Sequence, residues 1–305
     1  MHLKKSSARF RSYSLIDMME YKKININDLP KYSPWPARLL CSEKWIRDRR
    51  TNKENYREYE SEKWGPLAKM CRKSDLPLTL SNVNLIEHEM DRNSSDFILC
   101  SKNDSMGLYT KENAYNNLVE DLACYFKQLH DFSAIVELGA GYGNVLFRLL
   151  AHFPAIKEIL AGEFSASGRW LIKAIAETEN IPIKVVNCNF NSKPICNEVI
   201  PEGALIFTCA SVVCVPRLGK EFVNNMLALN PTYVAHFEPF RECETSLISM
   251  MRNRYLEVND YNNNLEYLLS EAEAEGKIAI CLKSDQLIRV NPLMAYTLTV
   301  WKKHN

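Results

Sequence analysis

The chain has 305 residues, and its 38 Lys and Arg against 37 Asp and Glu give a formal net charge of +1. Hydrophobic residues make up 46% and charged residues 25%, a composition typical of soluble globular proteins that excludes disordered and fibrous ones. The near-zero charge argues against nucleic acid or an acidic membrane as partner.

The cysteines and the apolar runs indicate a compartment. The ten cysteines form no C-x-x-C pair and no zinc-finger spacing with the histidines, so we expect no metal site and no disulfide framework. The longest apolar run, from Ala204 to Pro216, is shorter than the about 20 residues that a bilayer requires. Together these features predict a cytoplasmic chain.

The first part of the chain differs in texture from the rest. Residues 1–15 carry four basic residues and no acid, which favours a flexible basic tail over a transit peptide. A charged helix is expected between Arg47 and Lys63, among turns that prolines break. We therefore predict a mainly helical N-terminal extension or cap over residues 1–110 and a second domain over residues 111–305.

From Lys111 onward strands and helices alternate. An amphipathic helix over 111–129 precedes five apolar strands, which are expected at 134–138, 158–164, 182–188, 204–209 and 233–237. Helices are expected at 144–152, 167–179, 218–229 and 244–275, the last broken near 259–264, and 277–283 and 295–302 are expected to pair as antiparallel strands. This order predicts an α/β fold, with a doubly wound, mostly parallel, seven-stranded Rossmann-like sheet and an antiparallel terminal hairpin.

A glycine-rich turn follows the first of these strands. Glu137 stands at the carboxyl end of the strand, and Gly139, Gly141 and Gly143 lead into the next helix. Glycine lets the backbone turn tightly and approach a ligand closely. Dinucleotide sites use G-x-G-x-x-G instead, and an acid before the loop repels a pyrophosphate but suits an ammonium group.

This pattern resembles the E-x-G-x-G-x-G motif of class I S-adenosylmethionine (SAM) methyltransferases. The resemblance covers about the last 190 residues, including the final hairpin that separates methyltransferases from dehydrogenases. Glu163 lies 163 − 143 = 20 residues past the last glycine, where a carboxylate accepts hydrogen bonds from both ribose hydroxyls. Asn189 stands where the family usually has an acid for the adenine amine, and Phe190 is placed to pack on the adenine. The predicted SAM site comprises Glu137, Gly139, Ala140, Gly141, Gly143, Asn144, Glu163, Phe164, Asn189 and Phe190.

The methyl acceptor should lie beyond the fourth and fifth strands. Glu238 ends the fifth strand, and His236, two residues earlier, shares its face, so we predict both as catalytic groups that orient or deprotonate an acceptor. A half-buried structural histidine is an equal interpretation of His236. Asp260 lies in an Asn-rich break that is either a surface kink or a polar wall of the acceptor pocket. Cys209 and Cys214 are read as buried structural thiols in preference to nucleophiles.

The sequence thus predicts a SAM-dependent methyltransferase that acts on an O or N atom of a small polar metabolite. A sugar, an amino acid or a guanidine is expected, because the tyrosine, Asn and Asp side chains around Asp260 suit a polar molecule. The acidic residues from Glu238 to Asp260 favour a cationic acceptor. Three alternatives stay open: a peptide or protein methyltransferase, a non-catalytic SAM-binding partner subunit, and an RNA methyltransferase, whose basic aromatic patch is weak here. The sequence also leaves open whether the chain forms a homo-oligomer.

Overall fold

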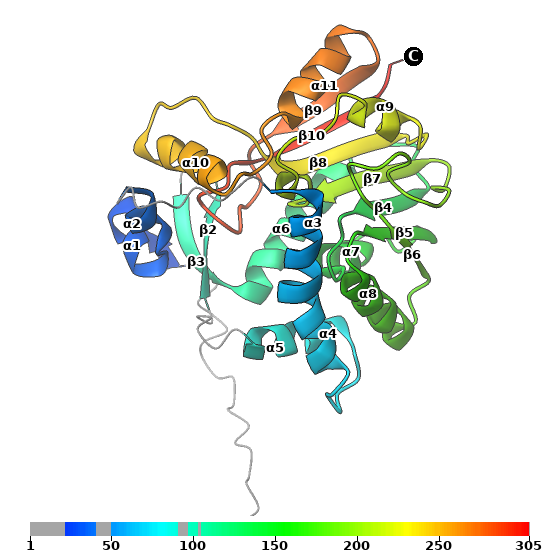
Figure 1. Ribbon diagram of the computed structural model, residues 1–305, viewed down its shortest axis with the longest axis horizontal. Helices are drawn as coiled ribbons and strands as arrows, with labels where there is room; N and C mark the ends of the chain where they lie inside the picture. Colours follow the sequence, from blue (N-terminus) through cyan, green and yellow to red (C-terminus); the bar gives the residue numbers. More distant parts are fainter. Residues whose placement is uncertain (1–21, 41–49, 91–96, 103–104, 305) are drawn as a thin grey trace, which may run out of the picture.

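The computed structural model describes residues 22–40, 50–90, 97–102 and 105–304. Its centre is a seven-stranded sheet in the order β6-β5-β4-β7-β8-β10-β9 (Figure 1). The strands are β4 (Ala134–Leu138), β5 (Glu158–Glu163), β6 (Ile183–Asn187), β7 (Ala204–Cys209), β8 (Tyr233–Pro239), β9 (Ile278–Ser284) and β10 (Tyr296–Lys303). Strands β4 to β8 are parallel, and β10 pairs antiparallel with both β8 and β9. The predicted fold class is confirmed.

Helices cover both faces of this sheet. One face packs on α6 (Lys111–Phe126), α7 (Asn144–Leu150) and α8 (Ala166–Glu179), in a core that contains Ile135 and Phe207. The other face packs on α9 (Phe222–Leu227) and α11 (Leu265–Ala274), in a core that contains Val136 and Val234. Successive residues of a strand point to opposite faces, so residue parity decides which core each side chain joins.

The N-terminal segment adds a small sheet as well as helices. Its strands β1 (Lys22–Ile24), β2 (Phe97–Lys102) and β3 (Ser105–Thr110) pair antiparallel in the order β1-β3-β2. The helices are α1 (Leu29–Tyr32), α2 (Trp35–Leu40), α3 (Asn52–Arg57), the π-helical turn η3 (Glu58–Trp64), α4 (Gly65–Cys71) and α5 (Leu80–Met90). These strands were not expected from the sequence: β1 has only three residues, and Gly107 weakens the strand pattern of β3. Residues 1–15, predicted as a basic tail, lie outside the described residues.

Two connecting features bear on the site. The predicted break between helices is confirmed: α10 (Leu247–Val258) ends at Asn259, and α11 begins after a turn. In that turn Asn262 donates to the carbonyl of Val215 at 2.7 Å and accepts from the N–H of Leu265 at 2.9 Å. No helix in the described ranges is long and apolar enough to cross a membrane.

Candidate functional site

A cavity of about 330 Å³ opens at the carboxyl ends of the central strands. It lies where β4 and β7 are neighbours although β5 and β6 come between them in the chain, the position where open α/β sheets bind ligands. Nine of the ten predicted SAM-site residues line it, and Gly143 is the exception. The structure therefore brings the predicted cofactor residues together at one wall.

The glycine loop has the backbone shape that the sequence predicted. Gly139, Gly141 and Gly143 have φ angles of +77°, +61° and +88°, which residues with a Cβ rarely adopt. A Cβ on Gly139 would lie 2.4 Å from the Cβ of Ser211, so the β4 and β7 loops touch only because glycine is there. Gly143 is the N-cap residue of α7, and its positive φ angle lets the loop turn into this helix.

Glu137 is the unusual group of this wall. Its side chain lines the cavity and is buried, and its Oε2 has no hydrogen-bond partner within the described residues. Burial raises the pKa of this carboxyl well above its ordinary value, and the nearby Glu163 raises it further. A buried polar atom without a partner is costly in a folded protein, so Glu137 is suited to a ligand that brings donors.

Glu163 and the residues after β6 form the next part of the wall. Glu163 Oε2 accepts from the N–H of Gly141 at 3.0 Å, and Oε1 accepts from the N–H and hydroxyl of Ser165 at 2.8 and 2.7 Å. Burial raises the pKa of Glu163, while these hydrogen bonds oppose the rise. Asn189 and Phe190 line the same cavity, at the edge formed by β6.

The N-terminal extension covers this cavity, which the sequence analysis did not place in detail. The run α3–η3–α4 stands beside the ends of the central strands (Figure 1), and Asn52, Asn55, Tyr59, Lys63 and Trp64 line the cavity. A Cβ on Gly141 would lie 3.1 Å from the Trp64 ring. The indole Nε1 of Trp64 is buried without a hydrogen-bond partner among the described residues, so the cavity has an unpaired donor as well as the unpaired Glu137 acceptor.

Contacts to the cofactor loops fix the extension in place. Glu60 accepts from the N–H and hydroxyl of Ser167 at 2.9 and 2.7 Å, in the first turn of α8. The Tyr59 hydroxyl lies 2.7 Å from Cys214 Sγ, and the Tyr56 ring meets Phe164 edge-on at 5.1 Å. No periodicity in the sequence signals such contacts, because they join residues more than 100 positions apart.

Glu238 does not reach the cavity, which corrects the prediction that it faces the acceptor. Its Oε1 accepts from the N–H groups of Ser211 and Val212, and its Oε2 from that of Val213, all at 3.0 Å. The side chain is 1% exposed and is absent from the cavity wall. Glu238 therefore holds the loop after β7 in shape, and a catalytic role for it is not supported by this geometry.

His236 lies in the core on the opposite face of the sheet. Its Nδ1 is 2.9 Å from the Thr208 hydroxyl, and its ring lies near the rings of Phe222 and Trp301 at 6.1 and 6.2 Å. Burial lowers the pKa of His236 to about 3. His236 and Glu238 do share a face, as alternation predicted, but the cavity lies on the other one, where Phe237 points.

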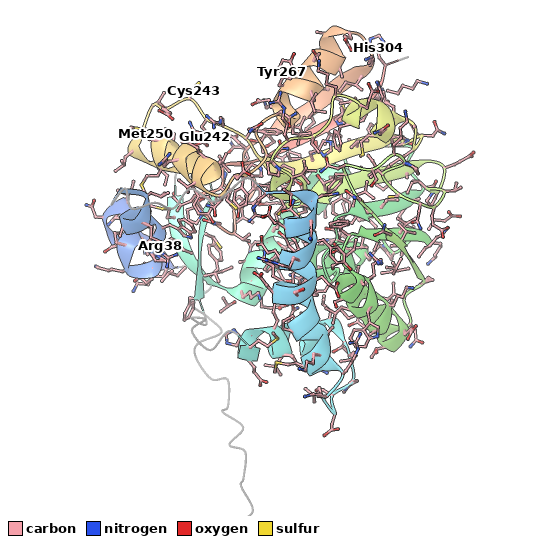
Figure 2. All side chains as sticks on the ribbon, viewed as in Figure 1. Arg38, Glu242, Cys243, Met250, Tyr267 and His304 are labelled. Atoms are coloured by element: carbon pink, nitrogen blue, oxygen red, sulfur yellow. The ribbon has the colours of Figure 1, made fainter. Side chains whose placement is uncertain are left out.

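Asp260 and the acidic residues near it are occupied elsewhere. Asp260 Oδ2 accepts from the N–H of Arg50 at 2.6 Å, which ties the extension to the turn after α10. Glu242 binds Arg252 at 3.1 Å beside α10 (Figure 2), and Glu257 binds Arg254 at 2.9 Å. None of these acids lines the cavity, so the reason for expecting a cationic acceptor is removed, and Asp260 is not part of a polar wall of this cavity.

The cysteines at the cavity behave as structural thiols. Burial raises the pKa of Cys209 and of Cys214, and Glu137 and Glu238 raise that of Cys209 further. A raised pKa favours the neutral thiol, which is a weaker nucleophile than the thiolate. The nine described cysteines are all free, and no cluster of three or more His, Cys, Asp or Glu in the described ranges is arranged to hold a metal.

Comparisons with known proteins give similarity only at the level of structure. Family models and curated proteins contain no match to this chain. The chain is similar to the pyocyanin biosynthetic protein PhzM at 13% identity and a TM-score of 0.46, over 63% of this chain and 56% of that protein. It is similar to a SAM dependent methyltransferase from Aquifex aeolicus (12% identity, TM-score 0.44, 64% and 94% covered) and to the mitomycin 7-O-methyltransferase MmcR (11%, 0.45, 89% and 69%). The match to PhzM spans little more than half of that protein.

The strand order itself identifies the fold. Numbered along the chain from β4, the sheet runs 3-2-1-4-5-7-6, and only its seventh strand is antiparallel to its neighbours. The resemblance seen in the sequence implied a final antiparallel hairpin, and β9 and β10 form it. The chain has the fold of class I SAM-dependent methyltransferases.

Proposed function

We propose that the chain is a SAM-dependent methyltransferase. The observation that carries the proposal is the unpartnered carboxylate oxygen of Glu137 at the cavity wall, beside the glycine loop. An ammonium group supplies both the charge and the donors that this oxygen lacks, whereas the pyrophosphate of a dinucleotide would be repelled. The amino-acid end of SAM carries such an ammonium.

The remaining wall residues fit the other parts of SAM. Glu163 would accept hydrogen bonds from the ribose hydroxyls. Asn189 would form a hydrogen bond with the adenine, and the Phe190 ring would pack on it. The unpaired Trp64 N–H is suited to the carboxylate of the amino-acid end. When bound, SAM supplies a methyl group on a sulfonium sulfur; Tyr59, Trp64 and Tyr142 would exclude water and keep the two reactants aligned.

The enclosure of the cavity favours a small-molecule acceptor. The extension crosses the cavity and is bonded to the loops on either side, at Ser167 and at Cys214. A peptide or an RNA strand would have to displace these contacts. The intact set of Glu137, glycine loop and Glu163 also favours an active enzyme over a partner subunit that only binds SAM.

Calorimetric titration with SAM, with S-adenosylhomocysteine (SAH) and with NAD tests the proposal. We expect micromolar binding of SAM and SAH and none of NAD. Glu163→Ala should weaken SAH binding by about a hundredfold, because it removes charge-assisted hydrogen bonds worth about 1.5–3 kcal/mol each. Glu158→Ala, at the exposed start of the same strand, should change nothing. NAD binding, or equal SAH affinity in Glu163→Ala, would contradict the cofactor assignment.

A further inference from the structure

We infer that the inner half of the cavity is an acceptor site for a planar aromatic molecule that carries a polar group. This inference rests on the proposed methyltransferase function and adds the chemical class of its acceptor. The site, here called the aromatic slot, is formed by Tyr115, Leu118, Cys209, Phe237, Val290 and Tyr296, which all line the cavity.

One wall of the aromatic slot is the sheet itself. Cys209 of β7 pairs directly with Phe237 of β8, and Phe237 pairs with Leu298 of β10, two residues from Tyr296. Alternation therefore places Cys209, Phe237 and Tyr296 on one face of three neighbouring strands. This is the face that also carries Glu137. A molecule in the slot would thus lie beside the predicted amino-acid end of SAM.

The walls are flat and mostly apolar. The rings of Phe237 and Tyr296 are stacked, with centroids 4.9 Å apart and an interplanar angle of 16°. The facing wall is α6, from which Tyr115 and Leu118, three residues apart, point to the cavity. Flat ring walls stabilise a planar apolar guest through area burial and ring stacking.

The aromatic slot has few polar groups, and the charged residue near it is already hydrogen-bonded within the protein. The Tyr115 hydroxyl has no hydrogen-bond partner among the residues that the structure describes, and burial raises the pKa of Tyr115, so it is a neutral donor. Glu87, the nearby acid, accepts from Lys111 Nζ at 2.5 Å and from the Tyr142 hydroxyl at 2.8 Å. A sugar or a guanidine would lose its hydration here without enough partners, which costs free energy. An aromatic ring with one hydroxyl or amine would not.

Saturation-transfer NMR on the SAH-saturated protein tests the inference with a mixture of 2-naphthol, arginine and glucose. We expect transfer to 2-naphthol alone. Tyr115→Phe should lower the affinity for 2-naphthol about fivefold and leave the affinity for naphthalene unchanged, since only the hydroxyl contact is lost. Leu118→Trp should fill the aromatic slot and lower the affinities for 2-naphthol and naphthalene at least tenfold. Cys124→Trp, at an exposed position of the same helix, should leave both affinities unchanged.

Each outcome separates the slot from the cofactor site. SAH affinity should stay within about threefold in all three variants. Transfer to arginine or glucose, or to none of the probes, in a protein that binds SAH overturns the aromatic slot and leaves the methyltransferase proposal standing. Equal 2-naphthol affinity in Tyr115→Phe and Leu118→Trp also overturns it. A chain that does not bind SAH overturns the proposed function, and the slot with it.

Discussion

The two halves of the cavity differ in how their residues are specified. The proposed cofactor half is formed by the ends of β4, β5 and β6, and its key groups are Glu137, the glycine loop, Glu163 and Asn189. Each of these lies at or shortly after the carboxyl end of a strand, so a short stretch of sequence fixes its place. The proposed acceptor half is formed by β7, β8, β10 and α6, and its strand residues meet only through the sheet register.

This difference explains why most of the predicted cofactor residues line the cavity, whereas Glu238, His236 and Asp260 do not. In the proposed cofactor half, Glu137 and Glu163 lie near the carboxyl ends of their strands and line the cavity. In the proposed acceptor half, Glu238 lies near the carboxyl end of β8 but binds backbone N–H groups instead, and the apolar Phe237 lines the cavity. Strand parity decides the outcome there, and parity depends on which sheet face the cavity occupies.

The largest effect is expected in the cofactor half, at Glu137. Glu137→Gln should weaken SAH binding about 10- to 100-fold, because the variant loses the charge that faces the ammonium. In the unliganded chain the raised pKa of Glu137 favours the protonated carboxyl, and a bound ammonium favours the ionised form. Wild-type affinity should therefore rise as pH increases through that raised pKa, with release of a proton on binding.

Calorimetry in buffers of different ionisation enthalpy measures the number of protons released when SAH binds. Fewer protons should be released in Glu137→Gln, and those that remain would come from Glu163, whose pKa is also raised. Glu158→Gln, at the exposed start of β5, is the matched control. Affinity that falls with rising pH, or an unchanged affinity in Glu137→Gln, would contradict the ammonium contact.

Glu238→Gln should lower the stability of the fold without changing the affinity for SAH appreciably. An amide has one acceptor oxygen, so at least one of the three N–H groups of Ser211, Val212 and Val213 is left unpaired. We expect the free energy of unfolding to fall by about 2 kcal/mol, with SAH affinity within about threefold of wild type. Urea unfolding and calorimetry measure the two quantities. Glu257→Gln, an exposed acid, is the control, and unchanged stability in Glu238→Gln would argue against the structural role.

His236 predicts a pH dependence of stability. It is neutral in the folded chain, with a pKa of about 3, whereas the unfolded chain binds a proton near the ordinary pKa of about 6.5. Its stabilising contribution is therefore complete above about pH 6.5 and is lost as the pH falls toward 3, at up to about 1.4 kcal/mol per pH unit. His236→Phe should reduce this slope in urea unfolding, and His130→Phe, in solvent, should not. A slope that is the same in all three proteins would place His236 outside the core.

Most of the sheet could be predicted from the sequence, because alternating apolar segments and glycine turns are local signals. The helix break near Asn262 was also predictable, since Asn side chains compete for backbone groups in turns. The strands β1 to β3 were missed, because β1 has only three residues, Gly107 interrupts the pattern of β3, and packing of distant segments stabilises the small sheet. The catalytic and structural interpretations of His236 could not be separated from the sequence, because alternation gives two faces but does not say which one holds the cavity.

The N-terminal extension could be predicted only in part, as a mainly helical cap. A substitution of Trp64 tests whether the extension contacts the cofactor or only closes the cavity. Trp64→Phe keeps a ring beside Gly141 and Tyr142 but removes the unpaired N–H. SAH affinity should therefore fall about tenfold, because a hydrogen bond to a charged carboxylate is worth at least about 1.5 kcal/mol. Methylthioadenosine lacks the amino-acid end and should bind both proteins equally. Trp170→Phe, on α8 against Arg72, is the control for loss of an indole. If both ligands weaken together, Trp64 acts by closing the cavity; if only SAH weakens, the extension is part of the cofactor half.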